Sequence, residues 1–343
     1  MTTKICNGLL KTLLISSLLI TSTQGYSQQK VKVKDDKMKM KEEHGKSMDN
    51  MNMNMNMKAK APLDTMSLER ILGMKGKVNN GEYKVTIPQN DLSVMVDEFK
   101  ITPPMGLSSW VAFTPSADGA MVMGDIIVTE TDLKPVQQEI IRQGLTSTAI
   151  HNHFLRNHPS VMYMHMGGSG SVEVMAKKAK AVLDKIKELR GGDPSKGTAS
   201  AEAVANTINT KSLDGIFGAK GEMTKGVFKY TFGRPDVDLR EHGVKITTFL
   251  GFNTWAAWQG TPDKAAVAGD FVMLEDEVEP VVKALIENNI EVVALHNHMV
   301  HEKPHVFFLH YWGIGNAEQL AKGLKAAIDQ TGKKQGSGMN MKM

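Results

Sequence analysis

The stretch AIHNHFLRNHPSVMYMH, residues 149–165, returns 145 positions later as ALHNHMVHEKPHVFFLH, residues 294–310. Both stretches hold a His-x-His pair, a proline and a final histidine at the same spacing. On both sides of this block the match continues without gaps, so that residues 68–184 align with residues 213–329. The sequence therefore predicts a tandem duplication, with a first repeat over 63–190, a linker rich in small residues over 191–203, and a second repeat over 204–333.

Each copy is predicted to contain both strands and helices. Alternating apolar residues predict strands over 82–87, 93–102, 109–114, 121–128, 147–154 and 161–166 of the first copy. Helices are predicted over 68–73, 131–144 and 171–189, where apolar residues recur at helical spacing. We therefore expect an α+β fold with two tandem homologous domains, each a mainly antiparallel sheet with flanking helices.

The repeated histidines are the strongest candidates for chemistry. In a strand over 149–153, His151 and His153 would lie on one face, and the next strand would bring His165 beside them. Three neutral imidazoles with an open position are typical of catalytic zinc, and imidazole also suits copper or nickel. We predict such a metal site in each copy; hydrogen-bonded polar histidines are the alternative. The six candidate ligands are His151, His153, His165, His296, His298 and His310.

Two pairs of acidic residues precede the predicted second helix of each copy. Glu130 and Glu275 are candidate catalytic residues, as proton shuttles, and could also supply a fourth ligand or orient a histidine. Glu130 could instead belong to the first turn of a helix, where negative charge suits the dipole. Asp125 and Asp270 could supply a fourth ligand, orient a histidine or act as a base. A turn or bulge residue is the alternative for Asp125.

The N-terminal 27 residues have the three-part plan of a secretory signal peptide. Lys4 and Lys11 are followed by an apolar run over 13–20 and then by small residues up to Ser27. That run is too short to cross a bilayer core of about 30 Å as a helix. We expect an exported protein, periplasmic or extracellular after cleavage. The single cysteine, Cys6, would leave with the signal, which excludes internal disulfides and cysteine-ligated zinc or iron–sulfur centres.

Methionine is concentrated at both ends of the mature chain. Residues 28–62 are mostly Lys, Met, Asn, Asp and Glu, which predicts a disordered linker, and residues 334–343 form a second Met-rich tail. Thioether sulfur is a soft ligand that selects Cu(I). Copper capture is thus one interpretation of the linker, and a neutral dipeptide repeat that serves as a spacer is the other. The candidate thioether ligands are Met51, Met53, Met55 and Met57.

Charge and hydropathy exclude two classes of partner. The formal net charge is +4, and the lysines are scattered through both halves rather than gathered on one face. We therefore expect no nucleic-acid partner. No stretch after the signal peptide is long and apolar enough for a transmembrane helix, so none is expected in the mature chain.

Several shared blocks resemble a known family. Gly124-Asp125, then Glu130 with Pro135, and Ala149-x-His-Asn-His with its downstream proline, histidine and Gly-x-Gly are similar to the LppY/LpqO family. These are exported bacterial proteins with a domain of unknown function, and the resemblance covers both repeats. It implies location and architecture rather than an activity. That family often includes lipoproteins, whereas this chain has no cysteine at the end of its signal.

Three functions fit these features. The first is an exported metal-binding protein that uses copper or zinc in metal handling or tolerance. The second is a zinc-dependent hydrolase of the cell envelope, and the third is a non-catalytic module that binds an envelope ligand. The partner is accordingly a metal ion or a cell-envelope ligand. The sequence leaves open whether the protein is an enzyme.

Overall fold

The computed structural model describes residues 62–333. The signal peptide, the Met-rich linker with Met51, Met53, Met55 and Met57, and the Met-rich tail therefore lie outside the described residues. Within 62–333 the two repeats follow one another with the same order of helices and strands. The predicted α+β class, with two similar halves, is confirmed.

The first repeat builds a six-stranded antiparallel sheet in the order β1-β2-β5-β6-β9-β7. Its elements are α1 (Thr65–Leu72), β1 (Lys77–Asn79), β2 (Glu82–Pro88), β3 (Val94–Val96), β4 (Phe99–Ile101), β5 (Ser108–Ser116), β6 (Gly119–Thr129), α2 (Glu130–Arg142), β7 (Thr146–His151), β8 (Asn157–His158), β9 (Val161–Gly170) and α3 (Val172–Arg190).

The second repeat builds the equivalent sheet in the order β10-β11-β14-β15-β18-β16. Its elements are α4 (Thr210–Phe217), β10 (Glu222–Thr224), β11 (Val227–Gly233), β12 (Arg240–Glu241), β13 (Val244–Lys245), β14 (Asn253–Gly260), β15 (Ala265–Leu274), α5 (Glu275–Glu287), β16 (Glu291–His296), β17 (Glu302–Lys303), β18 (Val306–Gly315) and α6 (Ala317–Ile328).

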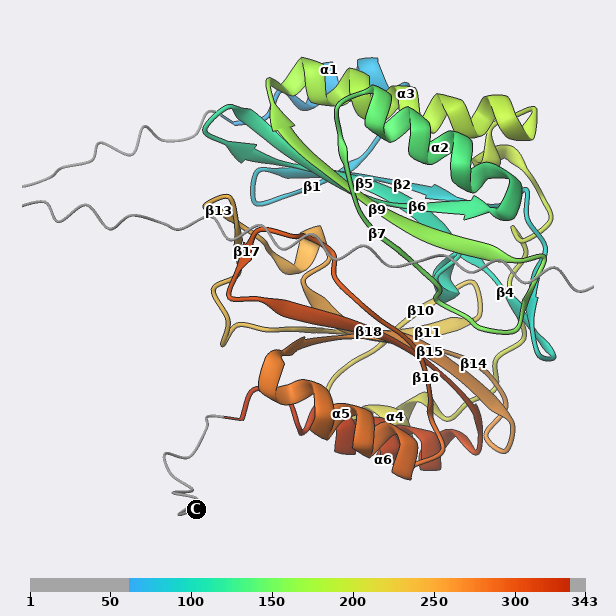
Figure 1. Cartoon of the computed structure of the whole chain (residues 1–343). Helices are drawn as coiled ribbons and strands as arrows, with labels where there is room; N and C mark the ends of the chain where they lie inside the picture. The colour runs from blue at the N-terminus through green and yellow to red at the C-terminus, as the bar shows by residue number, and fades with distance from the viewer. Residues whose placement is uncertain (1–61, 334–343) are drawn as a thin grey trace, which may run out of the picture. The chain divides into compact units, whose positions relative to one another are not determined.

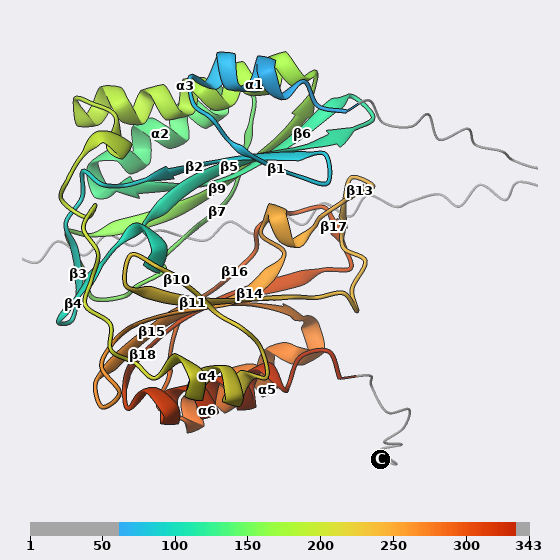
Figure 2. The same cartoon turned by 180° about the vertical axis from the view of Figure 1, so that it is seen from behind.

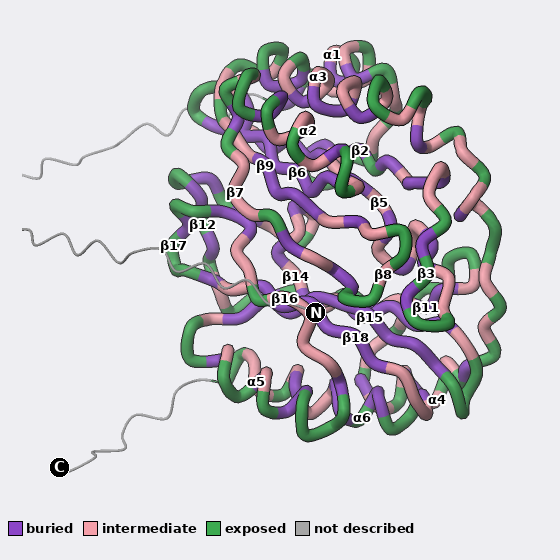
Figure 3. Tube along the Cα trace, turned by 45° about the vertical axis from the view of Figure 1, so that its right-hand side comes forward, coloured by how far each residue is buried: buried purple, intermediate pink, exposed green. Residues whose placement is uncertain are grey.

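The two sheets face each other, and the helices cover their outer faces (Figures 1 and 2). Helices α1, α2 and α3 cover the first sheet, and α4, α5 and α6 cover the second. On each strand one set of alternate residues packs against the helices in an apolar core, and the other set points to the opposite sheet. Burial is accordingly concentrated on the central strands, whereas exposed residues follow the outer helices and the loops (Figure 3).

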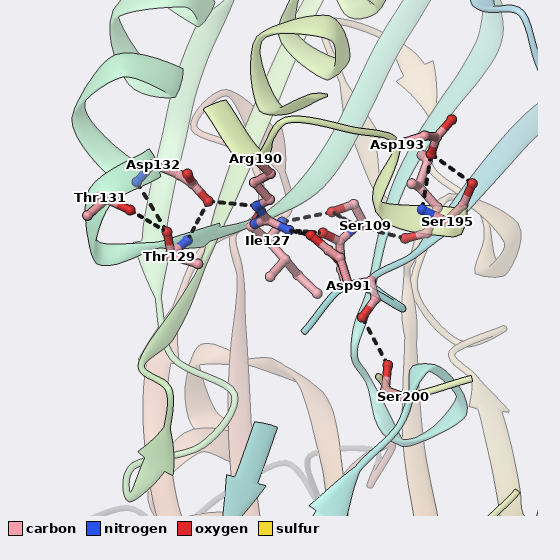
Figure 4. A network of polar contacts seen from close by, with 12 residues as sticks. Asp91, Ser109, Ile127, Thr129, Thr131, Asp132, Arg190, Asp193, Ser195 and Ser200 are labelled. Carbon is pink, nitrogen blue, oxygen red and sulfur yellow. Dashed lines mark hydrogen bonds and ion pairs between the residues drawn. The ribbon is translucent and has the colours of Figure 1, made fainter. Parts of the chain in front are cut away.

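In each repeat an arginine with a largely buried side chain binds the helix layer to the sheet, but the two arginines come from different positions. In the first, Arg190 of α3 donates to Asp132 near the start of α2 (2.8 Å) and to the carbonyl of Ile127 (3.1 Å), as Figure 4 shows. In the second, Arg234 beyond β11 donates to Glu277 of α5 (2.7 Å) and to the carbonyl of Val272. The carbonyls and the helix acids are equivalent in the two copies, so two different chain positions supply the same contacts.

Two small sheets lie at opposite ends of the interface between the repeats. The predicted strand over 93–102 is in fact a hairpin, β3 and β4, which turns at Asp97 with a φ of 51° and joins β8. Its equivalent in the second repeat is β12 and β13 with β17. Figure 1 places these two groups at opposite edges of the facing sheets. Each packs with residues of both repeats into its own apolar cluster.

Candidate metal centre

The strands of the first repeat place its three histidines on the face that meets the second sheet. β7 pairs with β9, so that His151 lies opposite Tyr163 and Ala149 lies opposite His165. The sequence predicts His153 on the same strand as His151, but β7 ends at His151. His153 therefore lies beyond the strand. It still reaches the same face, because its ring stacks on that of Tyr163.

The second repeat repeats this geometry with one change of neighbour. His296 lies opposite Phe308 on β18, and His310 lies opposite Asp270 on β15. The ring of His298 stacks on Phe308, which occupies the position of Tyr163. The hydrogen bond that Tyr163 donates to the carbonyl of Gly106 (3.1 Å) therefore has no equivalent from this side chain.

The two sets of histidines meet across the interface between the repeats. Ring centroids lie 3.9 Å apart for His151 and His296. The two other cross-repeat pairs lie at 3.7 Å for His153 with His310 and at 4.0 Å for His165 with His298. This is the reciprocal pattern of a two-fold interface, in which residue i contacts j and j contacts i. We call these six residues the six-histidine centre; it replaces the two separate sites that the sequence predicted.

Most ring nitrogens of the centre lack a hydrogen-bond partner among the described residues. Both nitrogens of His151 and both of His296 are buried without a partner in good hydrogen-bond geometry, although the backbone of Phe308 interacts with the His296 ring. One ring nitrogen each of His153, His165 and His310 is in the same state. By contrast, Nδ1 of His310 contacts the carbonyl of Gly269 at 3.0 Å, which fixes the orientation of that ring. Such orphaned atoms are rare in folded proteins and mark a place where another group is expected.

Burial also keeps these rings neutral. It lowers the pKa of His296 to about 3. Burial, together with neighbouring histidines, lowers the pKa of the other five well below the ordinary value of histidine. A neutral ring keeps a lone pair available, which is the form in which histidine binds metals.

Three groups of side chains bring possible ligand atoms within 4.8 Å of one another. Two of them mix the repeats, and one adds an aspartate to two histidines of the first repeat. A tetrahedral zinc site holds its nitrogens about 3.3 Å apart, so a bound ion would draw these rings somewhat closer. The groups are His151 with His296 and His310, His165 with His296 and His298, and Asp125 with His151 and His165.

The family model described as Domain of Unknown Function (DUF1259) matches the chain at residues 66–185 and again at 211–330. The chain belongs to this family. The two matches coincide with the two repeats, and the family description assigns no activity to either. They support a repeated domain of unknown function, while the LppY/LpqO name stays a resemblance. Among curated proteins, no sequence matches the chain.

Two solved structures are distantly similar to this member of the family. The trimeric bacterial microcompartment shell protein PduB is 9% identical, with a TM-score of 0.19 over 75% of this chain and 90% of that chain. EtuB from Clostridium kluyveri is 6% identical, with a TM-score of 0.17 over 74% and 88%. These scores are too low to carry any argument about fold or function.

Of the predicted acids, the structure brings the aspartates to the histidines and leaves the glutamates outside. Asp125 Oδ2 lies 3.6 Å from His153 Nε2, and Asp270 Oδ2 lies 3.7 Å from His298 Nε2. Burial raises the pKa of Asp125 to about 7 against the opposing charge of Lys84, and it raises that of Asp270 well above its usual range.

Glu130 and Glu275 are the exposed first residues of α2 and α5, which favours their interpretation as first-turn acids. Within residues 62–333, no helix is long and apolar enough to cross a membrane.

A cavity of about 470 Å³ leads from the surface to one edge of the centre. His298 is the histidine of the centre that borders it. The cavity lies between β6, β7 and β9 of the first repeat and the hairpin and loop of the second repeat that carry Glu241 and His301. Sequence reasoning missed this cavity, although its signal was present: Gly167 occupies the position that is Trp312 in the other copy.

Proposed function

We propose that this protein binds a transition-metal ion, copper or zinc, in the six-histidine centre. The observation that carries the proposal is the state of His151 and His296, whose four ring nitrogens are buried without a well-placed partner among residues 62–333, where the groups of possible ligands overlap. A metal ion would satisfy these nitrogens, and each unsatisfied buried polar group otherwise costs about 1–3 kcal/mol.

The biological role that we propose is metal handling or tolerance outside the cytoplasm. The predicted signal peptide supports export, and the Met-rich linker with Met51, Met53, Met55 and Met57 supports copper, because thioethers select Cu(I). Imidazole ligands alone suit both copper and zinc. The linker would then collect copper, and the folded repeats would hold the ion.

A zinc-dependent hydrolase is a second candidate, favoured by the cavity that borders His298. A small substrate could reach the centre through it. Because Glu130 and Glu275 are exposed on the outer helices, Asp125 and Asp270 are the acids that such a reaction would use. Its test is hydrolysis of nitrophenyl esters and phosphates by the zinc-loaded protein, compared with the variant described below.

The test of metal binding uses the untagged full chain, stripped of metal and dialysed against Zn²⁺ or, under reducing conditions, Cu(I). We expect the native chain to retain about one or two zinc ions, and His151→Leu with His296→Leu to retain none. The matched control is His158→Ala, an exposed histidine of β8. A further form with leucine at positions 51, 53, 55 and 57 should keep its zinc and lose part of its copper.

The unfolding temperature separates loss of ligands from loss of fold. Without metal, the double leucine variant should be at least as stable as the native chain, because leucine removes unpartnered polar atoms and fills a similar volume. With zinc, only the native chain and the His158→Ala control should gain stability. Zinc retained by the double variant would disprove the proposal. If no form binds metal, the ligand-binding module becomes the better interpretation.

A further inference from the structure

The two ends of the interface between the repeats carry different side chains at equivalent positions. At one end, Trp312 occupies the space between the sheets and packs edge-on against Phe99 and Phe154. Its Nε1 donates to Asp97 (3.0 Å), and Arg156 bridges Asp97 and Glu291 across the repeats. We call this the closed end, because aromatic rings and ion pairs fill it.

The equivalent position at the other end is Gly167, which offers no side chain, and the cavity lies there. We call it the open end. Its floor comes from β6, where the inward-facing residues Met121 and Met123 stand in place of Ala266 and Ala268 of the closed end. Met299 replaces Phe154. The second repeat therefore closes over the cavity with a flexible thioether where the first has a rigid ring.

These three thioethers are buried and border one cavity together with an imidazole of the centre. Met121, Met123 and Met299 are each less than 7% exposed, and His298 is 8% exposed. Met166 also borders the cavity, but it packs in the apolar core on the helix side and is not one of these donors. Thus the buried part of the open end carries thioethers at positions where the closed end has alanine and phenylalanine.

The mouth of the cavity carries further donors. His242 and His301 replace Asp97 and Arg156 of the closed end, and their ring centroids lie 4.8 Å apart. Both are exposed, whereas Glu241 beneath them is largely buried and accepts from the backbone N–H of His301 (3.2 Å). An ion that enters would meet imidazoles first, thioethers next, and then His298 of the centre.

We propose that the cavity is a Cu(I) site in its own right, formed by the thioethers of Met121, Met123 and Met299 with the imidazole of His298, from which copper passes to the six-histidine centre. The transfer to the centre rests on the proposed function, whereas the binding of Cu(I) in the cavity does not. Thioethers and imidazole suit Cu(I), and sulfur ligands of this neutral kind give Zn²⁺ little advantage over water. The site is therefore selective for monovalent copper.

The test compares Cu(I) with Zn²⁺ in a full-length background in which the methionines outside 62–333 no longer compete. That background has leucine at Met38, Met40, Met48, Met51, Met53, Met55, Met57, Met339, Met341 and Met343. Cu(I) affinity is measured anaerobically by competition with a chromophoric Cu(I) chelator, and Zn²⁺ affinity with a zinc chelator. The test variant is the triple change Met121→Leu, Met123→Leu and Met299→Leu, which keeps volume and removes sulfur. The matched control is Met105→Leu, a buried methionine of the closed-end cluster.

We expect the triple variant to lose at least about tenfold in Cu(I) affinity, with unchanged Zn²⁺ affinity, and the Met105→Leu control to match the background. The variant His151→Leu with His296→Leu should lose zinc yet still bind one Cu(I) ion, because the cavity donors remain. Unchanged Cu(I) affinity in the triple variant would overturn the cavity site. Loss of Cu(I) together with zinc in the histidine variant would overturn it as well. Failure of the centre alone would appear as a native chain that binds Cu(I) but no zinc.

Discussion

The open and closed ends share a backbone plan and differ in a few side chains. At the closed end Trp312, Phe154 and Arg156 fill and bridge the space, and at the open end Gly167, Met299 and His301 stand at the same positions. The six-histidine centre between them is nearly symmetric, but its surroundings are not. The comparison shows that duplicated sheets can keep the same histidines in both copies while the side chains around them diverge, with a cavity at one end and packed aromatic rings at the other.

The largest expected effect is on the free energy of unfolding, when the side chain of Trp312 is removed from the closed end. Trp312→Gly should reduce the free energy of unfolding by about 4 kcal/mol, because it empties the space between Phe99 and Phe154 and leaves Asp97 without its indole donor. Urea unfolding of the metal-free chain measures this. The milder Trp312→Phe keeps a ring in the space and should lose less than half as much. Equal losses for the two variants would contradict the proposed packing role.

Acid should destabilise the metal-free chain, and both ends should contribute. A histidine whose folded pKa lies below its unfolded value stabilises the fold above pH 6.5 and loses that stability as pH falls. The six histidines lose this stability together between pH 6.5 and 5.5, whereas Asp125 and Asp270, whose pKa values are raised, oppose the loss over the same range. Because six rings outnumber two carboxyls, we expect the free energy of unfolding to be lower at pH 5.5 than at pH 6.5, measurable by urea unfolding at both pH values.

Two single variants locate this acid effect. His153→Gln near the closed end and His298→Gln at the open end should flatten the pH profile equally, since burial lowers the pKa of both rings. Stability that rises on acidification would show that the carboxyls dominate. A flatter profile for one variant alone would show that the two ends titrate differently.

The smallest expected effect is on the rate of metal uptake. Gly167→Trp copies the closed end, and a Cβ at Gly167 has its nearest neighbour at 3.6 Å, so the backbone tolerates a side chain there. We expect zinc uptake, followed by stopped-flow competition with a fluorescent chelator, to slow about tenfold, or about 1.4 kcal/mol in barrier, with unchanged affinity. Gly167→Ala leaves most of the cavity open and serves as the control. Uptake as fast as in the native chain would show that ions reach the centre by another route.

Much of the fold could be predicted from the sequence because it depends on local period. Apolar alternation located the antiparallel strands, and period two placed His151 beside His165 on adjacent strands, which β7 and β9 confirm. The duplication is evident when the sequence is compared with itself after a shift of 145 residues. The bend at Asp97, which divides one predicted strand into β3 and β4, was missed because no glycine or proline marks it.

The contact between the histidines of the first repeat and those of the second could not be predicted in the same way. Which sheet faces meet is decided by the summed packing of both copies, and no local pattern reports that His151 will stack on His296. Proximity in the sequence wrongly suggested that Glu130 lies near the histidines. Glu130 follows Asp125 by only five residues, but it lies at the exposed start of α2. Comparing equivalent positions, such as Trp312 with Gly167, would have pointed to the cavity.

The sharing of one centre by both copies has an evolutionary consequence. After an ordinary gene duplication, one copy is free to decay while the other preserves the function. Here each group of ligands that mixes the repeats draws on both, so a lesion in either set of histidines damages the whole centre. If the centre binds metal as proposed, selection would act on the two halves as one unit. A relative with a single repeat could build this centre only by pairing with a second molecule of itself.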